Sequence, residues 1–159
     1  MLAVVPGLPY AKPIGIERIS LYDFFTDNPF LVFGQGTREP RRLVLTGFDS
    51  RSLSYQSSAQ RFSSRRERLQ HDLAVLMGFG LLISKPQARR VAYALSEAGK
   101  SQAASLRSLY AQLYRRSAEI IGRELNRLSD KALQEQTRKW LQTDAPLVDI
   151  FDVVGKDAL

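Results

Sequence analysis

The chain has 159 residues, 44% of them hydrophobic and none of them cysteine, which predicts a globular fold and excludes thiolate zinc sites, thiol catalysis and disulfides. Its formal net charge of +7 favours polyanionic partners. No apolar run reaches the length of a membrane span, and the lack of cysteine fits a reducing compartment, so we expect a soluble, cytoplasmic protein.

In the first sixty residues the sequence favours one helix and a loop insertion, preceded by a short apolar segment. Residues 1–5 are apolar and stop at a pair of prolines, as the last turn of a helix or a short edge strand. Residues 13–26 are predicted to be helical because proline suits a first turn and apolar side chains then recur at helical spacing. Residues 33–60, rich in glycine and serine, predict a loop insertion with a brief strand at 42–45.

The middle of the chain predicts a capped helix followed by two strands. Ser64, with Glu67 three residues later, forms a candidate capping box for a helix over residues 65–77, which Gly78 or Gly80 would end. The short apolar runs 81–83 and 91–95, separated by a proline-containing turn, are typical of a β-hairpin.

The last third predicts two helices and a tail. An apolar stripe of period near 3.6 predicts one long helix from Ser96 to about Leu125, and Ser129-Asp130 would cap a second helix that ends near Leu141. After Pro146 the chain is apolar but interrupted by aspartates, which suggests a surface for contact with another subunit or for packing on the long helix. The candidate partner-binding residues are Leu147, Ile150, Phe151 and Val154.

The positive charge is concentrated in one third of the chain. Between Arg38 and Arg90 there are eleven arginines and lysines against four acids, so this window carries the whole net charge. Clustered cations attract a polyanion far more strongly than scattered ones. The window therefore predicts contact with nucleic acid, although a docking face for an acidic protein or a solvated surface would have the same composition.

The order of these elements predicts an α+β, mostly helical fold in which residues 1–95 form a winged helix-turn-helix domain with the insertion at 33–60. Residues 96–159 would form a helical C-terminal extension. The capped helix would be the recognition helix and the hairpin the wing. The expected phosphate contacts are Arg61, Arg65, Arg66, Arg68, Lys85, Arg89 and Arg90. Sequence-specific readout is weakly supported, since the helix offers no asparagine and only Gln70 as an amide.

Catalytic motifs are absent from the sequence. His71 is the only histidine, and no second metal ligand or serine is spaced to join it, so a surface or core position is expected. Gly34-Gln35-Gly36 lacks the Lys-Ser/Thr of a phosphate-binding loop. We therefore expect neither an enzyme nor a bound metal or cofactor.

Four segments together resemble a known family. They are Ile16–Phe25, the basic helix leading into Gly78-Phe79-Gly80-Leu81-Leu82, Tyr93–Gly99, and Leu128-Ser129-Asp130-Lys131-Ala132-Leu133. In this order they are similar to the middle component of ABC-three-component systems, bacterial defence operons of the Lamassu type. The resemblance implies a non-catalytic winged-helix subunit that bridges an SMC-like ABC ATPase and a nuclease-type effector acting on phage or plasmid DNA.

Two other functions fit the same sequence. A free-standing transcriptional regulator would use the helix from Glu97 to Leu125 as a homodimeric coiled coil, and its isolated chain would sediment as a tight dimer. A purely structural spacer would have no DNA contact, and charge reversal of Arg65, Arg66 and Arg68 would then leave DNA binding unchanged.

Overall fold

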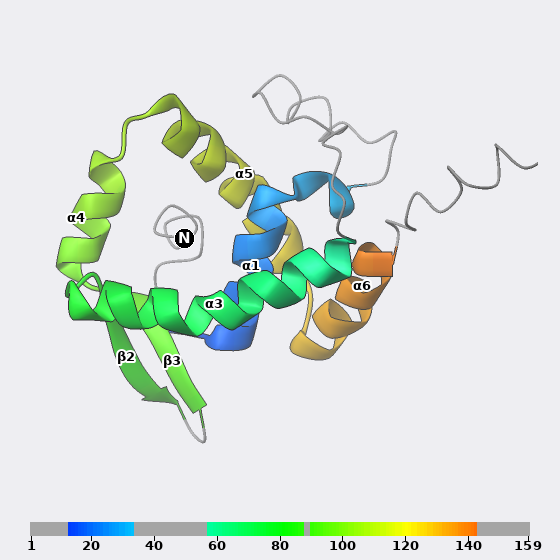
Figure 1. Cartoon of the computed structure of the whole chain (residues 1–159), viewed down its shortest axis with the longest axis horizontal. Coiled ribbons are helices and arrows are strands. Elements are labelled where there is room, and N and C mark those ends of the chain that lie inside the picture. The colour runs from blue at the N-terminus through cyan, green and yellow to red at the C-terminus, as the bar shows by residue number, and fades with distance from the viewer. Residues whose placement is uncertain (1–12, 34–56, 88–89, 143–159) are drawn as a thin grey trace, which may run out of the picture.

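Five α-helices and a small antiparallel sheet make up the described part of the chain, residues 13–33, 57–87 and 90–142 of a computed structural model (Figure 1). The predicted α+β, mostly helical class is confirmed. The elements in chain order are β1 (Ile14–Gly15), α1 (Ile16–Asp27), the 3-10 helix η2 (Pro29–Leu31), α3 (Ser58–Gly78), β2 (Leu82–Gln87), β3 (Arg90–Leu95), α4 (Glu97–Ser105), α5 (Leu109–Leu125) and α6 (Asp130–Gln142).

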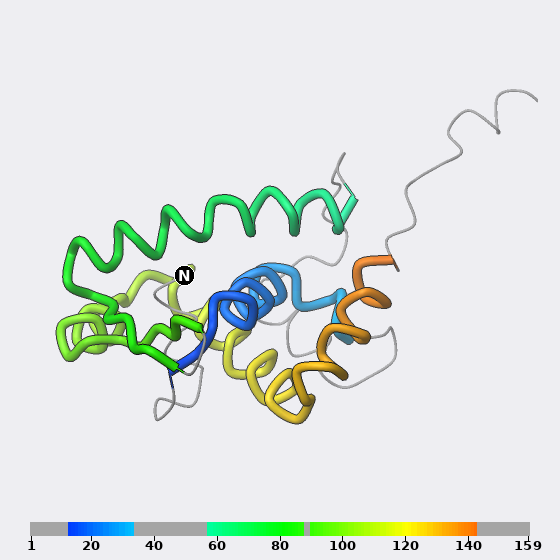
Figure 2. The backbone as a smooth tube through the Cα atoms, turned by 90° about the horizontal axis from the view of Figure 1, so that it is seen from below, coloured from blue at the N-terminus to red at the C-terminus, as the bar shows by residue number. Residues whose placement is uncertain are grey.

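Helix α1 is the centre of the fold and lies between α3 and α5 (Figure 2). Residues 19–26 are all buried, so this helix has no solvent face along its second half. One side of α1 packs Phe24 and Phe25 against α5 and α6. Ile19 instead joins Leu69 and Leu73 of α3 and the two residues at the base of the hairpin, Leu82 and Leu95. The apolar residues of α1 thus serve two clusters, as a central helix requires, while its buried polar side chains include Ser20, Asp23 and Thr26.

A row of aromatic rings ties three helices together across this core. Phe62 of α3, Phe24 and Phe25 of α1, and Trp140 of α6 meet edge to face, with neighbouring ring centroids 5.1–5.4 Å apart. Such pairs contribute about 0.5–1.5 kcal/mol each beyond the area they bury. The α6 helix, predicted over residues 129–141, is confirmed, and it packs on the same core as α1.

The sheet has the order β1-β3-β2 with antiparallel pairing throughout. The predicted strands at 81–83 and 91–95 are confirmed as a hairpin, with the first strand longer than expected. The helix predicted from residue 13 begins at Ile16, because Ile14 and Gly15 pair with Tyr93 and Ala92. This short pairing joins the start of α1 to the hairpin.

Helix α3 begins seven residues earlier than predicted. Ser57 and Gln60 form the capping box: the Ser57 side chain accepts from the Gln60 N–H, and the Gln60 side chain accepts from the Ser57 N–H. The capping box predicted at Ser64 and Glu67 is wrong, since both residues lie inside the helix. The basic residues therefore occupy the first half of α3 instead of its first turn.

The helix predicted from residue 96 to 125 is wrong as a single element. Leu106 has an extended backbone, and Ser108 caps a new helix by accepting from the Ala111 N–H. Arg115 of α5 donates to the carbonyls of Ala103 and Leu106 and so closes the C-terminus of α4. The predicted apolar stripe does not stay buried across this corner, since Leu109 and Tyr110 at the start of α5 are 71% and 69% exposed.

Several predictions lie outside the described residues: the apolar start (1–5), the strand at 42–45, most of the loop insertion, Arg89, and Leu147, Ile150, Phe151 and Val154. Of the helices in the described ranges, none has both the length and the apolar composition needed to cross a membrane.

Candidate nucleic-acid interface

The arginine at the middle of the predicted recognition helix contacts acids on α1. Arg65 donates from Nε to Asp23 Oδ2 and from a guanidinium nitrogen to Asp27 Oδ2, each at 2.6 Å. Its third nitrogen lies 3.2 Å from the Tyr114 hydroxyl of α5, which donates to Asp23 Oδ1. The Asp23 side chain is only 6% exposed, so Arg65 neutralises a carboxylate that the fold has removed from water.

The pKa shifts of Asp23 and Arg65 both favour the charged form of the ion pair. Burial is the largest single effect on Asp23 and raises its pKa, but the effects that lower it, led by the hydrogen bond from Arg65, together outweigh burial and hold the pKa below its ordinary value. Burial lowers the pKa of Arg65, and Asp23, Tyr114 and Asp27 together more than reverse this. Burial and the Asp23 charge raise the pKa of Tyr114, which keeps its proton and remains a donor.

Two further predicted contacts, Arg61 and Arg66, also have partners within the molecule. Arg61 donates to Asn28 Oδ1 at 2.6 Å and to Ser58 Oγ at 2.9 Å. Arg66 forms an ion pair with Glu17 at 2.6 Å, in which both side chains are more than half exposed. An exposed pair of this kind is weak, so Arg66 can still exchange its partner.

These contacts change the electrostatic character of α3. Helix α3 has four arginines and two acids of its own. The three acids of α1 form ion pairs with two of these arginines. The acids on α1 precede the basic window in the sequence, so the window alone overstates the charge of this surface. Helix α3 is close to neutral in the folded protein.

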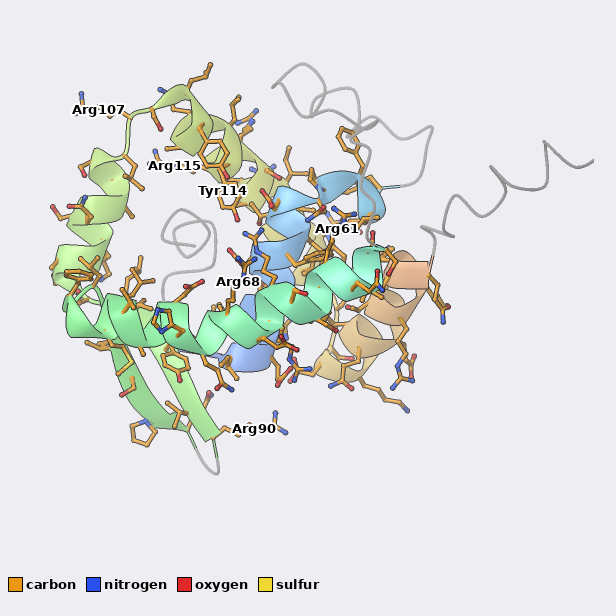
Figure 3. All side chains as sticks on the ribbon, viewed as in Figure 1. Arg61, Arg68, Arg90, Arg107, Tyr114 and Arg115 are labelled. Atoms are coloured by element: carbon orange, nitrogen blue, oxygen red, sulfur yellow. The ribbon has the colours of Figure 1, made fainter. Side chains whose placement is uncertain are left out.

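Three of the predicted cations point into solvent. Arg68, Lys85 and Arg90 are exposed, and within the described ranges no hydrogen bond or ion pair engages their charged groups. In Figure 3, Arg68 lies above α3, whereas Arg90 lies below α3, toward the tip of the hairpin. The predicted cations therefore do not form one continuous surface.

The strand register decides where the hairpin cations point. Leu82, Tyr93 and Leu95 pack in the cluster formed with α3. Side chains alternate between the two faces of a strand, so Lys85 and Arg90 belong to the opposite, outer face. Lys85 pairs with Ala92, and Arg90 lies two residues before Ala92, which makes the two cations diagonal neighbours roughly 7–8 Å apart.

The junction of α3, hairpin and α4 is held by two glycines. Gly80 has φ of +68°, and the N–H groups of Gly80 and Leu81 close the end of α3 on the Met77 and Leu76 carbonyls. A Cβ on Gly99 would lie 2.0 Å from the carbonyl oxygen of Leu81. Ser96 completes the junction, since its hydroxyl donates to the Gly80 carbonyl.

Sequence reasoning missed an exposed phenylalanine at this junction. Phe79 is 75% exposed, and Val75, one turn earlier on α3, is also exposed. The signal was a phenylalanine between two glycines at a helix end, where the backbone turns before the side chain can reach the core.

The described residues offer no site for metal chemistry. His71 is exposed on α3, in agreement with a surface position. No three acidic or histidine side chains within the described ranges lie close enough together to hold a metal ion.

Comparison with known proteins finds one relationship. Residues 50–144, more than half of the chain, match the family model described as ABC-three component (ABC-3C) system Middle Component 2. No curated protein and no solved structure matches the chain.

Proposed function

Because the chain belongs to the Middle Component 2 family of ABC-three-component systems, we propose that it is the non-catalytic subunit that bridges an SMC-like ABC ATPase and an effector nuclease and contacts DNA. Middle components are accessory subunits of these defence systems and act together with the other components. The family match, which spans α3 to α6, is the observation that carries the proposal.

A winged helix is the architecture that we propose for the basic part of the chain. Helix α3 is followed by the hairpin and then by a capped helix, and β1 adds a third strand beside β3. This order supports the prediction made from the sequence. The winged helix would then provide the DNA contact, and the remaining helices the framework for the other components.

The homodimeric regulator is disfavoured by two observations. Its coiled coil required one helix from Glu97 to Leu125, and the chain bends between α4 and α5. The apolar stripe of α5 is also buried against α1, with Ile121 and Leu125 inaccessible to a second copy.

The bridging role is tested by co-expression of the ATPase and effector components of the same system, with and without this chain. We expect the tagged ATPase to retain the effector only when this chain is present. Equal retention of the effector in its absence would contradict a bridge.

We propose that the DNA contact is made from among the predicted cations that have no partner in the described structure, which are Arg68, Lys85 and Arg90. Replacing all three with glutamine should weaken binding to any duplex and flatten the dependence of log K on log salt by about one unit per lost phosphate contact. The matched control replaces Arg107, Arg123 and Arg138, which are exposed in the turn between α4 and α5, on α5 and on α6 respectively. Equal losses in both triple variants would mean that only net charge matters.

A further inference from the structure

We infer that the hairpin, and not α3, is the element that enters DNA, with its outer face against the phosphate backbone of a duplex groove. This inference rests on the DNA contact in the proposed function and narrows it to one element. It reverses the roles expected from the sequence, in which α3 was the recognition helix and the hairpin an accessory wing.

Positive charge is more available on the hairpin than on α3. Neither strand of the hairpin contains an acidic residue, and Lys85 and Arg90 stand together on its outer face without a partner in the described structure. On α3, Arg65 neutralises Asp23, and Arg68 lies one turn before Asp72, which lowers the local positive potential. The hairpin is thus the more cationic of the two elements.

The shape of the hairpin also suits a duplex groove. The hairpin projects from the body of the protein (Figure 1), and from Ile83 to Gln87 every residue of β2 is exposed. At the far end of the hairpin Pro86, Gln87, Arg90 and Val91 are all exposed, whereas Ala92, opposite Lys85, is buried. A two-stranded ribbon is an element that the major groove of B-DNA, about 12 Å wide, can admit. Helix α3 is instead backed along its length by α1 and the sheet.

The edge of the hairpin is poorly suited to recruiting a peptide. Strand β2 forms an edge of the described sheet, and an exposed edge commonly binds a peptide by adding a strand. Pro86 lies within β2 and has no N–H to donate, and Lys85 precedes it; both are features that block strand addition. The outer face with its cations remains as the surface for a ligand, and its charge fits a phosphate backbone.

The contact is expected to carry little sequence information. Lys85 and Arg90 can make two phosphate contacts. The other outer-face residues of β2 are the apolar Ile83 and Gln87, and Gln87, which pairs with Arg90, is the one side chain on this face of the strand with an amide that could read a base edge. Phosphate contacts fix the orientation of a protein on DNA but do not distinguish bases. A subunit with such a hairpin would bind duplexes of any sequence.

The test measures binding of the full-length chain to a labelled duplex of arbitrary sequence by fluorescence anisotropy over a range of salt concentrations. The hairpin variant Lys85→Gln/Arg90→Gln should flatten the salt slope by about two units, whereas Arg68→Gln should leave it unchanged. Arg107→Gln/Arg123→Gln removes the same net charge elsewhere and serves as the control. Because all these side chains are exposed, the urea midpoints should match that of the wild type.

The remaining outcomes distinguish a failure of this inference from a failure of the proposed function. A loss with Arg68→Gln equal to that of the hairpin variant overturns the inference and leaves DNA binding intact. Equal losses in the hairpin variant and the control reduce the effect to net charge. Failure of the wild-type chain to bind the duplex overturns both DNA statements, while the bridging role is still decided by co-expression. If the hairpin variant binds DNA normally but no longer assembles with the ATPase, the surface belongs to a protein partner and the inference is wrong.

Discussion

Replacing Arg65 with methionine separates a structural arginine from a DNA-binding one. Methionine keeps much of the length of the side chain but removes its charge and hydrogen bonds. The Asp23 carboxylate, 6% exposed, would then lose its main partner inside the protein. Removing one member of a buried ion pair costs about 3–5 kcal/mol. Arg65 is itself 30% exposed and water can reach the vacated space, so we expect the lower end, about 3 kcal/mol.

The assay is urea unfolding followed by circular dichroism. With an m value of about 2 kcal/mol/M, a loss of about 3 kcal/mol lowers the midpoint by roughly 1.5 M. The matched control is Arg68→Met, three residues along the same helix, where the side chain is exposed and no partner is lost among the described residues. That variant should stay within about 0.5 kcal/mol of the wild type.

Asp23→Asn in the Arg65→Met background identifies the cause. The double variant no longer buries an unpaired charge, so it should recover part of the stability that Arg65→Met loses, and the double-mutant cycle should give a clear coupling energy. Equal midpoints for Arg65→Met and Arg68→Met would refute the reasoning, since Arg65 would then be another solvated arginine.

Two further predictions address the pH dependence and the glycine junction. The folded pKa of Asp23 lies below its unfolded value of about 3.8, so its stabilisation is present above that pH and is lost as the pH falls further; acid titration of the unfolding free energy should be shallower for Asp23→Asn. Gly99→Ala should cost about 1–3 kcal/mol because its Cβ would overlap the Leu81 carbonyl, whereas Gly78→Ala, whose Cβ meets nothing within 4 Å, should be neutral or stabilising in thermal unfolding. Equal melting temperatures for the two alanine variants would contradict the close approach.

The local elements were largely predictable from the sequence, because their signals are local. The hairpin followed from two short apolar runs around a proline-containing turn, and α6 from a serine cap and an apolar stripe. The errors occurred where two signals of the same kind compete. Ser57 and Ser64 are both plausible caps, and only the packing of Phe62 and Arg61 against α1 and its flank explains why the helix includes the earlier residues.

The break between α4 and α5 shows a second limit. Apolar side chains kept their spacing through the corner, so periodicity predicted one helix. The signal for the break was Ser108, a cap residue within an apparently continuous pattern. Arg115 stabilises the corner from a position nine residues beyond Leu106, which a local pattern cannot anticipate.

What the sequence determined by itself was the class of the fold, the family and the location of the charged window, since all three depend on residue order and composition. Which of those charges remain available was decided by the tertiary structure. Asp23 and Asp27 lie outside the basic window in the sequence but beside Arg65 in the fold, and the strand register turns Lys85 and Arg90 away from α3. An electrostatic potential depends on distances in space. The α1 carboxylates therefore offset the charge of α3, although they lie outside the basic window in the sequence, and the cations of the hairpin are not offset in this way.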